Sequence, residues 1–178
     1  MKAVLRILNL QRLGLTGFLV IAICTAGSAP TNSVPVVAAF ELRDQYDALH
    51  RIAFPAANVT VLTVADRKGS EQIDGWIAPL KERYAERIAI MGIADMSQVP
   101  GLLRSMVKNR FSRRYPHPVM LDWEGLVARG FHYQQDKANL FVIDRDGRVT
   151  GHFTGATNEV VLRALFTGVD LALSKPSQ

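Results

Sequence analysis

The segment that constrains the fold most is NVTVLTVAD at 58–66, because it is apolar on both faces of an extended chain. Val59 and Val61 lie on one face of such a strand. Leu62 and Val64 lie on the other, and the β-branched residues favour the extended backbone. A strand that is apolar on both faces has to be covered on both sides, as in sheets sandwiched between helices. The segment therefore predicts an α/β domain with this strand near its centre.

Further strands are expected on both sides of this segment in the chain. Two short strands around a polar turn are predicted in 34–52, buried strands in 87–95 and 117–123, and a hairpin in 139–153. In the hairpin, Gly147 ends the turn and supplies the positive φ that the turn requires.

Amphipathic helices are expected between these strands. The first should begin with Ser70 as its N-cap and with Glu71 and Asp74 in its first turn. Pro79 removes one backbone donor inside it, so we expect a kink. Its predicted inward face has helical spacing and consists of Ile73, Trp76, Ile77, Leu80, Tyr84 and Ile88.

Two more helices and a short helical segment at 123–133 complete the pattern. Pro100 is expected to open the second helix, whose predicted inward residues are Leu102, Leu103, Met106, Val107 and Phe111. Thr157 is expected to cap the last helix, with one side formed by Val161, Ala164, Leu165, Gly168 and Ala172. Alternating strands and helices followed by a hairpin predict a three-layer α/β sandwich.

Three segments carry a resemblance to a known superfamily. FELRDQYDALHRI (40–52), PVMLDWEGLVARGF (118–131) and NLFVIDRDGRV (139–149) resemble, in this order, the thioredoxin-like superfamily, in the branch of peroxiredoxins and TlpA-type thiol proteins. The run 99–149 is similar to YtfJ-like periplasmic proteins. The resemblance implies a thioredoxin-like domain over 36–173, with a central mixed sheet, an N-terminal hairpin extension and helices on both faces.

The chain departs from this superfamily at two positions. Where the superfamily has its attacking cysteine, the junction VADRKGSEQ has Lys68 or Gly69, and Glu71 stands near the second cysteine position. Where the superfamily has a cis-proline, the loop QQDKAN has Ala138. A cis bond before a residue other than proline costs about 3 kcal/mol, so we expect a trans bond there.

The first forty residues indicate export. Basic residues precede an apolar run from Leu13 to Cys24, and small residues follow, which is the pattern of a secretory signal peptide. We expect a signal peptide over 1–29, cleaved after Ala26 or Ser28, a short disordered lead at 30–35, and a tail at 174–178. The protein would then be periplasmic or extracytoplasmic. An uncleaved membrane anchor and a lipoprotein are the alternatives, although Ile23 is unsuitable before a lipidated cysteine.

Cys24 is the only cysteine of the chain, and it belongs to the predicted signal peptide. Thiol-disulfide exchange and peroxide reduction by this fold both need a thiolate. We therefore expect no catalytic residue and no cofactor, and a non-catalytic binding or assembly module in the cell envelope. The alternative is a peroxiredoxin-like or thiol-disulfide oxidoreductase in which Cys24 survives.

A binding site is expected at the start of the first helix, where unpaired amides and basic side chains suit an anion or an acidic partner. The residues of this candidate site, with the adjacent loop, are Asp66, Arg67, Lys68, Gly69, Ser70, Asp136, Lys137 and Ala138. The alternative is that Arg67 and Lys68 are solvated and that Asp66 only caps the turn.

A second basic feature, RSMVKNRFSRRYPH, contains no acidic residue. Its cations are Arg104, Lys108, Arg110, Arg113 and Arg114. They could contact anionic lipid, a polyanion or an acidic protein surface, or they could form a solvated helix end. Removing 1–29 removes three basic residues and no acid, which lowers the net charge from +5 to +2. This small charge argues against a nucleic-acid partner, and the oligomeric state stays open.

Metal binding is not expected. His50, His117, His132 and His152 lack ligand spacing, although His117 and His132 could approach each other across a sheet end. The turn 144–147 lacks the further carboxylates of a calcium loop.

Overall fold

The computed structural model describes residues 35–175, so the predicted signal peptide, nearly all of the lead and the end of the tail lie outside the described residues. The elements in chain order are β1 (Phe40–Arg43), β2 (Leu49–Ile52), β3 (Val59–Ala65), α1 (Arg67–Ser70), α2 (Asp74–Tyr84), η1 (Ala85–Arg87), β4 (Ile88–Asp95), η2 (Gly101–Leu103), α3 (Arg104–Arg114), β5 (Met120–Asp122), α4 (Leu126–Gly130), β6 (Asn139–Ile143), β7 (Val149–Thr154) and α5 (Glu159–Ser174).

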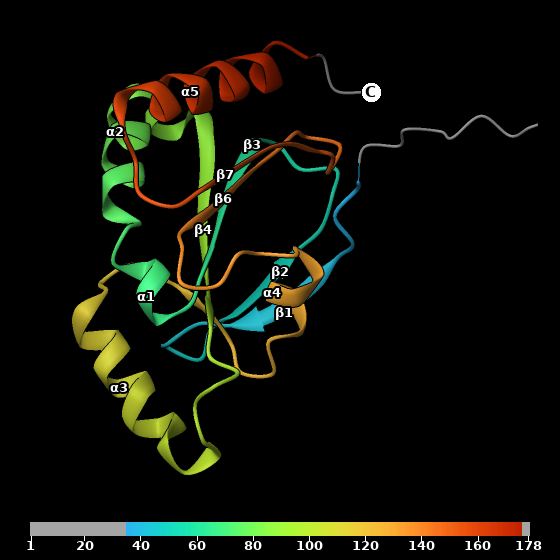
Figure 1. Ribbon diagram of the computed structural model, residues 1–178. Helices are drawn as coiled ribbons and strands as arrows, with labels where there is room; N and C mark the ends of the chain where they lie inside the picture. Colours follow the sequence, from blue (N-terminus) through green and yellow to red (C-terminus); the bar gives the residue numbers. More distant parts are fainter. Residues whose placement is uncertain (1–34, 176–178) are drawn as a thin grey trace, which may run out of the picture. The chain divides into compact units, whose positions relative to one another are not determined.

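The main sheet has five strands in the order β5-β4-β3-β6-β7 (Figure 1). β3, β4 and β5 run parallel, while β6 and β7 are antiparallel additions. Every residue of β3 is buried, which confirms that the doubly apolar segment is the central strand. β1 and β2 form a separate antiparallel hairpin. This arrangement is the mixed sheet with an N-terminal hairpin that the sequence predicts.

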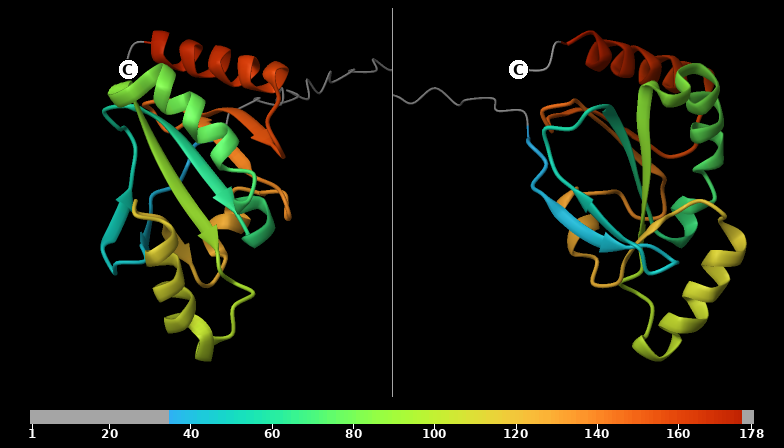
Figure 2. Two further views of the ribbon diagram at one scale, coloured as in Figure 1. Left: turned by 90° about the vertical axis from the view of Figure 1, so that its left-hand side faces the viewer. Right: turned by 180° about the vertical axis from the view of Figure 1, so that it is seen from behind.

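Two hydrophobic clusters cover the two faces of the sheet. On one face, α2 and α5 bury Trp76, Leu80 and Leu165 against Val61 and Val142. The Trp76 indole N–H donates to the carbonyl of Gly155 at 2.8 Å, so its one polar atom is satisfied inside the core. The other face is covered by α4, the β1–β2 hairpin and the segment before it. The three-layer α/β sandwich is therefore confirmed (Figure 2).

The starts of two helices differ from the prediction. Ser70 is the last residue of α1 rather than an N-cap, because the Asp66 carboxylate caps α1 and a turn separates α1 from α2. Asn158 rather than Thr157 caps α5, since its side chain accepts hydrogen bonds from the amides of Val160 and Val161. Asx side chains reach the amides two and three positions further along, and Asn158 has the extended backbone that this geometry needs.

The ends of the helices also bring corrections. Ile88 begins β4 instead of continuing α2, which runs unbroken through Pro79 to Tyr84. Leu102, Leu103 and Met106 do not point inward: their side chains are 98%, 42% and 61% exposed. The reason is that the apolar side chains by which α3 packs on the domain are Val107 and Phe111, which contact residues of β4, β5 and the neighbouring loops. The helix therefore turns its N-terminal apolar residues to solvent.

β5 is short, and Gln45 in the turn between β1 and β2 explains why. The Gln45 side chain is buried, donates to the carbonyls of Tyr115 and His117 at 3.0 and 2.7 Å, and accepts from the amide of Val119 at 2.8 Å. Pro118 has no N–H with which to continue a ladder. Among the described residues, no strand therefore pairs with the outer edge of β4 over Ile88–Gly92.

Candidate functional site

The junction between β3 and α1, where the superfamily resemblance places redox cysteines, is closed by a carboxylate. Asp66 Oδ1 accepts from the amide of Gly69 at 2.8 Å, and Asp66 Oδ2 accepts from the amide of Asp136 at 2.7 Å. Lys68 Nζ reaches Asp136 Oδ2 at 3.0 Å. The predicted residues of 66–70 and of the loop 136–138 are thus brought together, but their polar groups bind one another.

Gln72 ties the same loop to the segment between α1 and α2. Its amide nitrogen donates to the carbonyl of Asp136, and its amide oxygen accepts from the N–H of Ala138, both at 3.2 Å. The peptide bond before Ala138 is trans, as predicted, and the residue is fully buried. A proline at this position would lack the N–H that Gln72 binds. Because residue 138 is alanine and not proline, its backbone N–H is available to bind the side chain of Gln72.

Gly69 allows the two segments to approach. A Cβ atom at this position would lie 2.2 Å from the carbonyl oxygen of Lys137, far inside van der Waals contact. Asn139 holds the loop from the other side, because its buried amide donates to the carbonyls of Gln134 and Lys137 at 2.8 and 2.9 Å. The loop 134–138 consequently packs directly against α1 and is held in place by hydrogen bonds.

The predicted anion site has few groups left for a ligand. Asp66 caps the turn, which agrees with the alternative stated above, and Lys68 is paired with Asp136. Arg67 is exposed and has no ionic partner among residues 35–175. Ser70 donates its hydroxyl to the carbonyl of Arg67 at 2.7 Å. Lys137 also has no ionic partner in this part of the chain, and its Nζ donates to Gln134 Oε1 at 3.0 Å. An anion at this end would therefore meet two cations without ionic partners, Arg67 and Lys137, and a helix of a single turn.

A tyrosine–carboxylate pair lies nearby, at the end of β4. The hydroxyl of Tyr133 donates to Asp95, which also accepts from the amide of Ser97 at 2.9 Å. Burial disfavours the charged form of Asp95, but the hydrogen bonds from Tyr133 and Ser97 outweigh it and lower the pKa of Asp95. Burial, together with the hydrogen bond to Asp95, raises the pKa of Tyr133. The pair is therefore an ionised acid bound to a neutral phenol, which fixes the loop before β6.

A cavity lies beside this junction, along the open edge of β4. It is a groove of about 350 Å³. The walls and floor are mainly apolar and include Ile73, Ile77, Ile90, Gly92, Phe111 and Tyr115. In the left view of Figure 2, β4 (yellow-green) crosses the front of the molecule between α2 (green) and α3 (yellow).

The groove combines an unpaired strand edge with two charged side chains. The edge Ile88–Gly92 contains no charged residue and no proline, the two devices that usually protect an exposed strand from pairing. Asp74 and Lys81 of α2 line the groove and have no ionic partner in the described part of the chain. They are seven positions apart in the sequence, which is about 10 Å along a helix. The groove can therefore hold an extended polypeptide by backbone hydrogen bonds to the strand edge and by charges opposite to those of Asp74 and Lys81.

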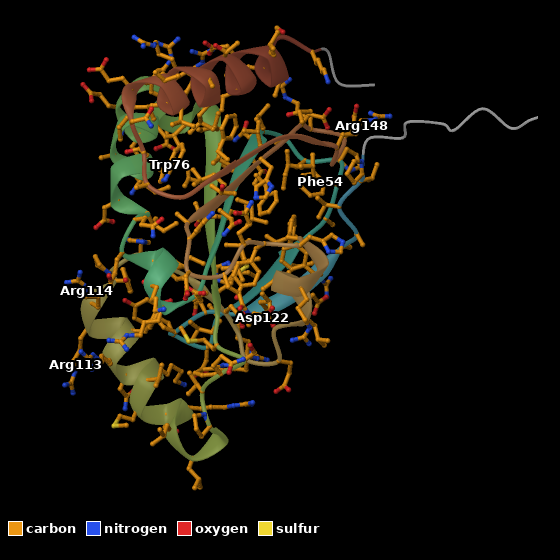
Figure 3. The ribbon with its side chains drawn as sticks, viewed as in Figure 1. Phe54, Trp76, Arg113, Arg114, Asp122 and Arg148 are labelled. Carbon is orange, nitrogen blue, oxygen red and sulfur yellow. The ribbon has the colours of Figure 1, made fainter. Side chains whose placement is uncertain are left out.

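The predicted basic patch is divided by the tertiary structure. Arg104 pairs with Glu124 at 3.0 Å, and Lys108 pairs with Asp47 at 2.6 Å. Arg110, Arg113 and Arg114 have no ionic partner among residues 35–175. In Figure 3, Arg113 and Arg114 point away from the body of the domain.

Sequence reasoning missed Gln45, Gln72 and Asn139, because single amide side chains in turns and at strand starts give no periodic signal. Only a polar residue at the head of the apolar strand NLFVI marks Asn139 as unusual. Among the described residues, no three His, Cys, Asp or Glu side chains lie close enough to hold a metal ion. No helix in 35–175 is both long and apolar enough to cross a bilayer.

The sheet order, the helices on its two faces and the N-terminal hairpin define a thioredoxin-like fold. In sequence comparisons, no known protein family and no curated protein matches the chain. The comparison with solved structures finds many proteins of this fold.

Three of the similar structures illustrate the kinds of protein that share this fold. A thiol:disulfide interchange protein of the thioredoxin family from Chlorobium tepidum is 18% identical, covers 80% of this chain and 98% of its own, and has a TM-score of 0.55. The exposed lipoprotein thioredoxin Etrx1 from Streptococcus pneumoniae is 14% identical over 75% and 99%, with a TM-score of 0.58. Peroxidoxin BcpB from Mycobacterium tuberculosis is 20% identical over 80% and 97%, with a TM-score of 0.54. At these identities the likeness establishes the fold.

Proposed function

We propose that this protein is a non-catalytic binding or assembly module of the cell envelope that holds an extended segment of a partner polypeptide. The observation that carries the proposal is the groove along Ile88–Gly92, an unpaired strand edge with apolar walls. Extended peptides bind such edges as an added strand, with main-chain hydrogen bonds for affinity and pockets for alternate side chains.

The chemistry of the groove describes the partner segment. Ile73, Ile77 and Ile90 favour apolar side chains on the face toward α2. A basic residue near Asp74 and an acidic residue near Lys81, about 10 Å apart, would complement the two unpaired charges. A second copy of this chain is a poorer fit, because its own β4 edge lies on the floor of the same groove.

The residues at the junction of β3 and α1, where the superfamily has its redox cysteines, support a role without electron transfer. Residues 35–175 contain no cysteine, and carboxylate, ammonium and amide side chains fill the junction of β3, α1 and the loop before β6. The signal-peptide pattern of residues 1–29 and the structural similarity to the exposed lipoprotein Etrx1 both support a location of this protein outside the cytoplasm.

Photocrosslinking in cells tests the proposal. A photoreactive amino acid at Ile77 should yield adducts with partner proteins, whereas the same group at Val160, which is 70% exposed on α5, should not. In the Ile77-labelled protein, Ile90→Lys should remove the adducts by placing an ammonium in the groove. Val160→Lys is its matched control, and circular dichroism checks the fold of each. Equal adducts from both positions, or adducts that survive Ile90→Lys, would contradict binding in the groove.

The anion site at 66–70 and 136–138 is a separate proposal with a separate test. Reversing both charges with Arg67→Glu and Lys68→Glu should leave the groove adducts unchanged, because Lys68 already has an internal partner and Arg67 is not among the groove-lining residues. If the adducts are lost in this variant but survive Ile90→Lys, the binding surface lies at the start of α1 and not in the groove.

The alternative of a thiol-disulfide or peroxide reductase is favoured by the fold, because structural neighbours are named for that chemistry. It requires that Cys24 remains in the protein and reacts. Intact mass of the protein recovered from the envelope shows whether Cys24 is present, and insulin reduction and peroxide consumption measure the activity. Stoichiometric thiol-dependent turnover would replace the binding proposal.

A further inference from the structure

The outward side of η2 and α3 combines apolar and basic side chains. Leu102, Leu103 and Met106 are exposed at its N-terminal end, and Leu102 is 98% exposed. Arg110 and Arg113 follow Met106 at helical spacing and line a shallow surface depression together with it. One side of the helix thus runs from an apolar tip to a basic end.

Contacts on the inward side fix which residues face outward. Val107 and Phe111 pack against a small cluster formed by Ala94, Met96 and Leu121. On the same element, the ion pairs of Arg104 with Glu124 and of Lys108 with Asp47 join α3 to two different loops of the domain. α3 cannot turn so as to bury Met106 and the preceding leucines of η2 without breaking these contacts. The exposure of the apolar tip is therefore a consequence of how the helix is anchored.

The position of the helix makes the tip accessible. In Figure 1, α3 extends beyond the lower end of the sheet, and the chain before it forms the lowest part of residues 35–175. Residues 101–119 contain no acidic side chain, so no carboxylate of this stretch neutralises Arg110, Arg113 and Arg114. The surface is complementary to a partner that offers an apolar phase beneath a layer of negative charge.

We propose that η2 and α3 dock on the surface of an anionic phospholipid bilayer. Leu102, Leu103 and Met106 enter the boundary between headgroups and acyl chains, while Arg110 and Arg113 lie at the level of the phosphates. The strength with which such peripheral segments bind membranes grows with the apolar area that they bury and with the attraction of their basic residues to anionic lipids. A soluble polyanion would use the arginines but would leave the leucines in water, which makes the bilayer the better fit. The proposal does not depend on the groove or its partner.

Fluorescence of the full chain tests the docking. In a Cys24→Ser background, an environment-sensitive NBD group is attached at Leu102→Cys or, as the matched control, at Val160→Cys on α5. With vesicles of equal parts phosphatidylcholine and phosphatidylglycerol, the emission at 102 should shift to the blue and the emission at 160 should not. Doxyl-labelled lipids should quench the group at 102 selectively. Because only a label near the bilayer responds, the readout separates α3 from any binding through 1–29.

The charge requirement is tested with the same label. Replacing Arg110, Arg113 and Arg114 by Gln should weaken the response roughly a hundredfold in lipid concentration, given the usual gain per basic residue near an anionic surface. Pure phosphatidylcholine should give little shift. An equal response at 102 and 160, a response that ignores lipid charge, or a response to heparin but none to vesicles would each overturn the proposal.

Discussion

At the scale of single residues, the junction between β3 and α1 shows how a thioredoxin-like fold is stabilised without sulfur at this position. Asp66 binds two backbone amides, and Gln72 binds one amide and one carbonyl. Each of these bonds joins segments more than sixty residues apart or caps the first turn of α1, so hydrogen bonds tie the loop before β6 to the start of α1.

Gly69 is the residue on which this close approach depends. Gly69→Ala should lower the free energy of unfolding by about 1–3 kcal/mol, because the added methyl group meets the carbonyl of Lys137 and the two segments have to separate. Urea unfolding followed by circular dichroism measures the change. Gly101→Ala, where a Cβ meets nothing within 4 Å, is the control and should be neutral or slightly stabilising. Equal effects in the two variants would refute the packing argument.

The Asp95–Tyr133 pair makes stability depend on pH. Because the folded pKa of Asp95 is lowered, its contribution is fully present above the unfolded pKa of about 3.8 and is lost as pH falls through the folded value. Tyr133→Phe should cost about 1–2 kcal/mol at pH 7 and progressively less below pH 4. Urea midpoints of both proteins from pH 3 to 7 measure this difference. A gap that stays constant down to pH 3 would show that the hydrogen bond does not depend on the charge of Asp95.

At the scale of elements, helix starts depend on local backbone geometry that hydrophobic spacing does not reveal. Asn158 and Thr157 are adjacent and both suit an N-cap by residue type, yet only Asn158 binds the amides of α5. Similarly, the long apolar pattern after residue 70 is not one helix. A turn at 71–73 precedes α2, and the three-residue η1 separates α2 from the start of β4.

A pair of alanine substitutions separates the two capping assignments. Asn158→Ala should destabilise the protein by about 1 kcal/mol, since two amides of α5 lose their acceptor. Thr157→Ala should change stability by less than about half of that. Thermal unfolding of the two variants under one condition provides the measurement. A larger loss in Thr157→Ala would restore the capping residue predicted from sequence.

At the scale of the whole molecule, burial is uneven between helices that look similar in sequence. α5 buries Leu165, Val169 and Ala172 completely, whereas α3 buries no residue completely. Regions with few buried contacts open locally at low free energy. The anchoring of α3 by two exposed ion pairs adds little, because such pairs contribute about 0–1 kcal/mol each.

The rate of amide hydrogen exchange should therefore differ between parts of the domain. Amides of β3 and α5 should exchange slowest, with protection close to that of global unfolding, and amides of α3 should exchange at least tenfold faster than those of α5. Exchange monitored by mass spectrometry on peptides from 104–114 and 159–174 measures the ratio. Equal protection of the two helices would mean that α3 is held by contacts beyond those described here.

The sequence by itself determined the α/β class, the central strand, the terminal hairpin and the absence of cysteine from residues 35–175, because periodicity and residue type are local properties. Tertiary structure alone decided which side chains contact one another. Asp66, Lys68 and Asp136 meet because β3 and β6 are neighbours. Gln45 leaves the β4 edge open by binding Val119, which is 74 residues away in the sequence. Ion pairs divide one run of five cations. Such contacts depend on the folded path of the chain, and no spacing along a single sequence encodes them.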